Sequence, residues 1–72
     1  MNRLMKFFAY SHLPAHLQEV SKPCGELAEV MDLLPEGAEK TAGLRKLLEA
    51  KDCFVRAKLE QYETAQENVK DS

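Results

Sequence analysis

The chain has 72 residues, with ten Lys and Arg against twelve Asp and Glu, and a formal net charge of −2. A chain of this length buries only roughly 60% of the surface that its unfolded form exposes, so a lone core is marginal without a disulfide, a metal or a partner chain. The negative balance argues against binding to duplex nucleic acid, and no segment supplies the roughly 20 apolar residues that cross a membrane. We therefore expect one soluble domain over residues 1–72.

Neither cysteine indicates a disulfide framework or a zinc site. Cys24 and Cys53 form no CxxC pair, Cys24 has no histidine at zinc-finger spacing, and both stand among apolar residues at helical spacing. We predict two small buried hydrophobes in a reducing compartment. Residues 1–10 lack the long apolar stretch and the cleavage site of a signal peptide, so we expect a cytoplasmic protein. Self-assembly is then the expected source of added stability.

The first half of the chain predicts a short N-terminal element and one long helix. Residues 1–11 contain a small apolar group that favours a short helix or arm lying across the rest of the fold. Residues 13–34 carry an apolar seam in steps of four and three, typical of a packed helix: Leu13, Leu17, Val20, Cys24, Leu27, Met31 and Leu34. Pro14 suits the first turn of this helix. Pro23 removes one backbone hydrogen bond, so we predict a kink there, the alternative being a new helix capped by Ser21.

The second half predicts a reversal and a second long helix. Pro35 and Gly37 favour a turn over residues 35–37, and a helical pattern follows over residues 38–65. A connection this short places the two helices antiparallel. The predicted fold class is therefore all-α: an antiparallel two-helix hairpin with a short N-terminal helix or arm, assembled into a homo-oligomeric bundle.

Two lysines fall within the apolar stripe of the second helix, where leucines, a valine and a tyrosine flank Lys51 and Lys58. A lysine in such a stripe is costly unless it snorkels to water, meets a carboxylate or binds an anion. For Lys58, near the end of the helix, snorkelling is the simpler interpretation. For Lys51 two interpretations stay open: an anion-binding residue, or a polar group that sets the register of an oligomer.

A separate face of the second helix carries Arg45, Glu49, Asp52 and Arg56. The acid and the base of each pair are four residues apart, so solvated ion pairs are the simplest interpretation. The alternative is that Arg45 and Lys46, near the turn, reach an anion across a subunit interface.

Aromatic and imidazole groups gather before and at the start of the first long helix, at Phe8, Tyr10, His12 and His16. Aromatic rings stack on nucleobases and nearby cations hold phosphates, which favours nucleotide binding. The alternative is an arm that packs its aromatic rings on the hairpin. His12 and His16 are four residues apart, but no third ligand accompanies them, so we expect no metal and no other cofactor.

The chain carries none of the patterns that indicate catalysis. No nucleophile, base and orienting group stand together, and no Gly-rich phosphate loop follows a strand. A thin hairpin also leaves little room for a cleft that excludes water. We therefore expect a protein that is not an enzyme.

A wider pattern runs through residues 8–57. It comprises the Phe8-Ala9-Tyr10 start, Pro14, Gln18, the Leu27-Ala28 pair, the Pro35 turn with Glu39, and the runs LRKLLEA at 44–50 and VRA at 55–57. This pattern resembles the helical-hairpin domain of phage anti-CBASS proteins. Those proteins are sponges that bind the cyclic oligonucleotide signals of bacterial antiviral immunity and withhold them from their effectors. A related hairpin occurs in anti-Thoeris sponges, which take up cyclic ADP-ribose-type signals.

The resemblance implies a hexamer of hairpins that holds its ligands between subunits. It implies that Tyr10 stacks on a base, as an aromatic residue does in that family. The family's lysine of the first long helix falls at or near Gly25 here, and Lys22, one turn away, is the substitute. A second pocket, for cyclic trinucleotides, draws on polar and basic residues of the second long helix, whose counterparts are Arg45, Lys46 and Arg56.

Together these observations predict a phage immune-evasion protein of the host bacterial cytoplasm. It would sequester a cyclic di- or trinucleotide, such as cyclic GMP–AMP, without degrading it and without binding duplex nucleic acid or a membrane. The expected ligand-binding residues are Phe8, Tyr10, His12, Lys22, Arg45, Lys46, Lys51 and Arg56. The alternative function is a helical-bundle adaptor or structural protein that binds another protein.

Overall fold

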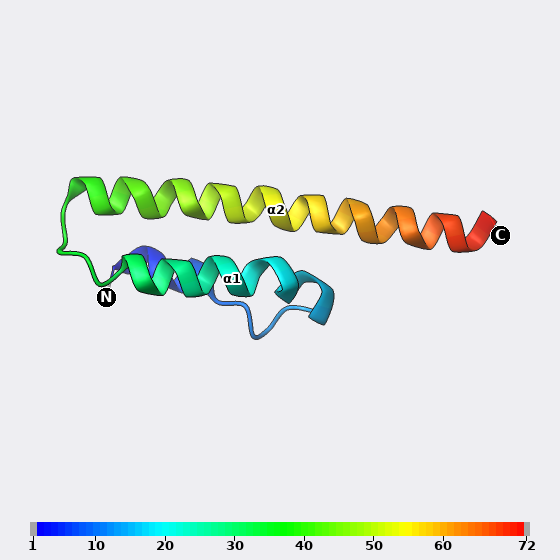
Figure 1. Cartoon of the computed structure of the whole chain (residues 1–72), viewed down its shortest axis with the longest axis horizontal. Helices are drawn as coiled ribbons and strands as arrows, with labels where there is room; N and C mark the ends of the chain where they lie inside the picture. Colours follow the sequence, from blue (N-terminus) through cyan, green and yellow to red (C-terminus); the bar gives the residue numbers. More distant parts are fainter. Residues whose placement is uncertain (1, 72) are drawn as a thin grey trace.

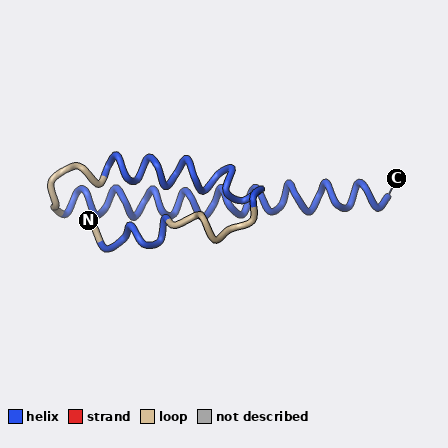
Figure 2. The backbone as a smooth tube through the Cα atoms, turned by 90° about the horizontal axis from the view of Figure 1, so that it is seen from below, coloured by secondary structure: helices blue, strands red, loops and turns tan. Residues whose placement is uncertain are grey.

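The computed structural model describes the backbone of residues 2–71 and the side chains of residues 2–64. It contains a short 3-10 helix, η1 (Arg3–Phe8), and two α-helices, α1 (Ala15–Met31) and α2 (Ala38–Asp71). α1 and α2 run antiparallel and side by side, and η1 packs against both (Figures 1 and 2). No strand occurs over residues 2–71, so the all-helical hairpin is confirmed. None of these helices is both long and apolar enough to span a membrane, as judged over the residues described.

α1 is shorter than the helix predicted over residues 13–34. It begins after Pro14, whose carbonyl accepts the first backbone N–H bonds of the helix. At the other end, the two N–H groups that follow Asp32 bond to carbonyls only three residues back. Pro35 disfavours a helical conformation in the residue before it, so the last turn tightens and the α-helix ends at Met31.

α1 is one helix, as the favoured interpretation predicts, and α2 is longer than predicted. α1 runs through Pro23 as a single helix, so the alternative of a new helix capped by Ser21 is not observed. The missing N–H of Pro23 leaves the carbonyl of Glu19 without its intrahelical partner. Both of these residues are exposed. α2 continues to Asp71, beyond the predicted end at residue 65, and its last part extends past α1 (Figure 1).

The hydrophobic core is small and draws on all three elements. Phe8 of η1, Ala28 of α1 and Leu44 of α2 form one cluster and are 3%, 0% and 2% exposed. Partly buried neighbours extend this cluster: Leu4, Met5, Leu47 and Leu48. Because burial of apolar surface is the main favourable term in folding, η1 is held to the hairpin as part of its core.

The face that α1 turns toward the core carries the buried Leu17 near its start and only small residues beyond it. Ser21, Gly25 and Ala28 are buried there, whereas Leu27 and Met31 of the predicted seam are 46% and 39% exposed. The predicted packing seam is therefore wrong for this half of the helix. We call Ser21, Gly25 and Ala28 the small-residue face.

Close approach of the N-terminal segment explains why α1 presents this face. A Cβ built on Gly25 would lie 3.0 Å from the carbonyl oxygen of Phe8 and 3.0 Å from the ring of Tyr10. Real Cβ atoms rarely come so close to backbone, so any other residue at this position requires the segment to shift by a few tenths of an ångström. Ser21 is also small, and it is fully buried on this face. Its hydroxyl has no hydrogen-bond partner among the described residues.

A polar cluster closes the turn end of the hairpin. The backbone N–H of Asn2 donates to a carboxylate oxygen of Asp32 at 3.1 Å, and its side-chain amide donates to Glu36 at 3.2 Å and to Thr41 at 3.1 Å. Lys40 Nζ donates to the backbone carbonyls of residues 32 and 34, each at 2.8 Å, and forms ion pairs with Asp32 and Glu36. We call Asn2, Asp32, Glu36 and Lys40 the turn latch.

Two contacts join α1 and α2 at the opposite end. The rings of His16 and Tyr62 stack with centroids 4.2 Å apart and planes 13° apart. Lys58 Nζ lies 2.6 Å from a carboxylate oxygen of Glu19. Lys58 therefore pairs with a carboxylate across the hairpin, which corrects the prediction that it snorkels.

The close packing at Gly25 generates a test with a matched control. Gly25→Ala forces the N-terminal segment away from α1, and we expect a loss of about 1–3 kcal/mol in the free energy of unfolding, the usual cost of overpacking. Gly43→Ala, in α2, meets no atom within 4 Å. It should gain up to about 1 kcal/mol, because alanine is the better helix former. Urea unfolding at one fixed protein concentration measures both, and equal effects of the two substitutions would contradict the packing described.

The turn latch generates a pH test. The hydrogen bond from Asn2, and then that from Lys40, lowers the pKa of Asp32, and the hydrogen bond from Lys40 lowers the pKa of Glu36. Because the pKa of both carboxyl groups in the folded protein lies below the unfolded value of about 4, the unfolded state binds protons first on acidification. The stability that these groups contribute is complete above that pH and is lost as the pH falls through the lowered pKa values.

We expect Lys40→Met to flatten the dependence of unfolding free energy on pH below about pH 5, in addition to lowering stability at every pH. Urea midpoints measured from neutral to acid pH give this slope. Lys46→Met, which removes an exposed lysine from the same helix, should show the same slope of unfolding free energy against pH as the parent protein. A Lys40→Met slope as steep as that of the parent would show that the latch does not control the titration of its carboxyl groups.

Candidate functional site: a basic groove

A groove of about 400 Å³ runs between the N-terminal segment and α2. We call it the basic groove, because three cations and one imidazole line it with a single carboxylate. Its lining residues are Lys6, Phe7, Ala9, His12, Leu13, Lys51, Asp52, Val55 and Arg56. Such a concentration of positive charge on a chain of net charge −2 indicates a site for an anion.

Lys51 joins the two walls of the basic groove. Its Nζ donates to the backbone carbonyl of Phe7 at 2.9 Å and lies 3.3 Å from a carboxylate oxygen of Asp52. Its side chain is only 12% exposed, so these contacts satisfy a charge that would otherwise be costly in an apolar stripe. The bond to Phe7 also satisfies a carbonyl at the end of η1, and it fixes that end against α2.

The other cations of the groove keep donors available for a ligand. Lys6 Nζ lies 5.2 Å from the centroid of the Phe7 ring, a cation–π contact, and Phe7 itself is half exposed. Arg56 donates to the sulfur of Cys53 at 3.3 Å. A thiol is a weak acceptor and a guanidinium has five N–H donors, so this contact engages little of its capacity.

The structure brings together three of the predicted ligand-binding residues and separates the rest. His12, Lys51 and Arg56 meet in the basic groove. Phe8 lies in the hydrophobic core, so its ring is not available for stacking, which corrects that prediction. Tyr10 is half buried, with its ring against the small-residue face. The remaining three are exposed and lie outside the groove lining: Lys22, Arg45 and Lys46.

Sequence reasoning missed Lys6, Phe7 and Asp52 as groove residues. Phe7 and Phe8 are neighbours, and only one of them faces the core. A 3-10 helix of six residues is too short for its apolar period to decide which one. The spacing predicts that Asp52 pairs with Arg56, whereas in the structure it pairs with Lys51.

The histidines and cysteines take different places from those expected. His12 lines the basic groove, whereas His16 stacks on Tyr62. The described side chains include no group of three His, Cys, Asp or Glu residues placed to hold a metal ion. Cys24 is half buried and Cys53 is exposed, so the prediction that both are buried is wrong.

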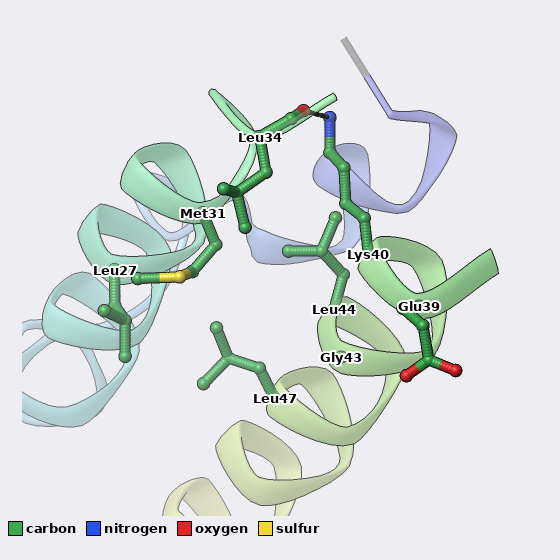
Figure 3. A pocket seen from close by; sticks show the side chains of 8 residues that line it. All are labelled: Leu27, Met31, Leu34, Glu39, Lys40, Gly43, Leu44 and Leu47. Carbon is green, nitrogen blue, oxygen red and sulfur yellow. Dashed lines mark hydrogen bonds between the residues drawn. The ribbon is translucent and has the colours of Figure 1, made fainter. Parts of the chain in front are cut away.

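A second hollow, of about 290 Å³, opens between α1 and α2 near the turn. Figure 3 shows Leu27 and Met31 of α1 facing Leu44 and Leu47 of α2 across it, with Leu34 at one end. We call it the apolar groove. It is a surface that the monomer leaves uncovered.

No protein-family model, curated protein or solved structure matches this chain. The comparisons therefore add nothing to the chemistry of the two grooves. The basic groove offers cations and an exposed aromatic ring, and the apolar groove offers hydrophobic surface.

Proposed function

We propose that this protein sequesters a cyclic oligonucleotide second messenger of bacterial antiviral signalling without degrading it. The observation that carries the proposal is the basic groove, where Lys6, Lys51 and Arg56 meet beside the exposed ring of Phe7. The resemblance of residues 8–57 to phage anti-CBASS sponges supplies the ligand class. Withholding the ligand from its effectors requires tight binding alone, with no bond cleavage.

Each part of such a ligand has a chemical counterpart in the groove. A phosphodiester accepts charge-assisted hydrogen bonds, which Arg56 donates as a planar fork and Lys6 as a point charge. A nucleobase presents a π-face to the half-exposed ring of Phe7. His12 also lines the groove. Lys51 contributes indirectly, because its bond to the Phe7 carbonyl holds the end of η1 in place.

We also propose that the chain assembles with copies of itself through the apolar groove and the adjoining face of α1. Leu27, Val30, Met31, Leu33 and Leu34 are 39–85% exposed, whereas the buried hydrophobic core of the described residues has only four members. A core that small is marginal for a chain of 72 residues, and a second copy is the partner that every folded chain has available. The resemblance favours a hexamer.

In an assembly, the predicted residues that lie outside the basic groove can contact a ligand bound to a neighbouring copy. The resemblance puts ligands between subunits, and residues exposed on one copy can then reach a ligand held by its neighbour. We therefore propose this role for the exposed Lys22, Arg45 and Lys46, and for the part of the half-buried Tyr10 that remains accessible.

Met31→Asp tests the assembly. A buried methionine side chain is worth about 1.5–3 kcal/mol, so burying a charge in its place should raise the dissociation constant of the oligomer by at least about tenfold. Sedimentation velocity over a concentration series measures the change. Ala15→Asp adds the same charge at an exposed position in the first turn of α1 and should leave the assembly intact. A parent protein that sediments as a monomer, or equal behaviour of the two variants, would refute the proposed interface.

Arg56→Gln tests the ligand site. A charge-assisted hydrogen bond contributes about 1.5–3 kcal/mol, so calorimetry should show binding of cyclic GMP–AMP or a cyclic trinucleotide weakened by at least about tenfold. Arg3→Gln removes an exposed arginine of η1 outside the groove and should bind like the parent. Ligand recovered intact after heating the complex would support sequestration. Degraded ligand, or no binding of any ligand of either class by the parent, would overturn the proposal.

A further inference from the structure

The charges that line the basic groove are unequal in number. Lys6, Lys51 and Arg56 are cations, and Asp52 is the single carboxylate. These four groups together give the lining two positive charges in excess. A ligand that neutralises this excess without repulsion therefore carries two negative charges.

The position of Asp52 decides which cations are free. Its carboxylate lies 3.3 Å from Lys51 Nζ, and Lys51 also donates to the carbonyl of Phe7 at 2.9 Å. Lys51 is thus occupied by partners within the protein. Lys6 and Arg56 are the two cations of the lining whose described contacts, an aromatic ring and a thiol, leave their charge unneutralised.

We propose that Asp52 is a specificity-determining residue, which limits the basic groove to ligands with two phosphodiester charges; this inference rests on the proposed function. Two phosphates of a cyclic dinucleotide pair with Lys6 and Arg56. A third phosphate meets the Asp52 carboxylate, and a like-charge contact of this kind discriminates strongly against the wrong partner. The preferred ligand class is therefore the cyclic dinucleotide.

The structural contribution of Asp52 is small enough to be separated from this role. Its side chain is half exposed, and exposed ion pairs contribute little to stability. The bond from Lys51 to Phe7, which fixes η1, does not depend on Asp52. Removing the carboxylate frees one N–H of Lys51 for a third phosphate and keeps the groove in place.

The test uses three ligands with one base and an increasing number of phosphates: cyclic AMP, cyclic di-AMP and cyclic tri-AMP. Calorimetry at about 0.15 M salt, where charges further than about 8 Å apart are screened, gives the dissociation constant of each. Asp52→Asn removes the charge and keeps the shape. Glu49→Gln makes the same charge change on α2 outside the groove lining. Asp52→Ser replaces Asp52→Asn if circular dichroism shows that the first variant does not fold.

We expect the parent to prefer cyclic di-AMP over both other ligands. Asp52→Asn should strengthen cyclic tri-AMP binding by at least about tenfold relative to cyclic di-AMP, and Glu49→Gln should leave that ratio within about twofold. An unchanged ratio in Asp52→Asn, an equal shift in Glu49→Gln, or a parent that prefers cyclic tri-AMP would overturn the role of Asp52 while the proposed function stands. A parent that binds none of the three, and no cyclic GMP–AMP, would overturn both.

Discussion

The close approach of the N-terminal segment to Gly25 is the constraint on which the rest of the structure depends. The Phe8 carbonyl and the Tyr10 ring occupy the space that a side chain at this position would need. With the segment seated there, Phe8 enters the core and its neighbour Phe7 faces outward. The Phe7 carbonyl then comes within reach of Lys51, and the basic groove forms between the two. The basic groove is thus a consequence of a packing contact made on another helix.

The same constraint sets the outer surface of α1. A helix that gives its small residues to the interior must turn its large ones elsewhere, and Leu27 and Met31 consequently line an open groove (Figure 3). Ser21 shows how strongly size governs the inner face, since its buried hydroxyl is left without a partner in the described part of the chain, a cost that a methyl group would avoid. The monomer therefore includes η1 in its core. It also leaves the hydrophobic surface of the apolar groove open, which suits a further copy of the chain.

The sequence predicted what depends on local signals. Scarce glycines and prolines indicated helices, Pro35 and Gly37 indicated the turn, and the place of Lys51 within an apolar stripe marked it correctly as a residue in need of a partner. The face that α1 turns inward was not predictable from apolar periodicity, because a small-residue face carries almost no hydrophobic signal. The groove was only partly predictable, because five of its lining residues come from the N-terminal segment, whose position depends on its packing against Gly25.

Lysines on one face of α2 connect it to the rest of the chain, and they differ in how far their surroundings neutralise their charge. Lys40, Lys51 and Lys58 are eleven and then seven residues apart, spacings that return to nearly the same side of a helix. Lys40 is enclosed by two carboxylates and two carbonyls at the turn, and Lys58 pairs with Glu19 of α1. The charge of each is matched by its partners, as a purely structural role requires. Lys51 has one half-exposed carboxylate beside it and two further cations across a groove, so positive charge remains in excess there alone among the three. An excess of this kind costs stability through repulsion, and binding an anion is the event that relieves it.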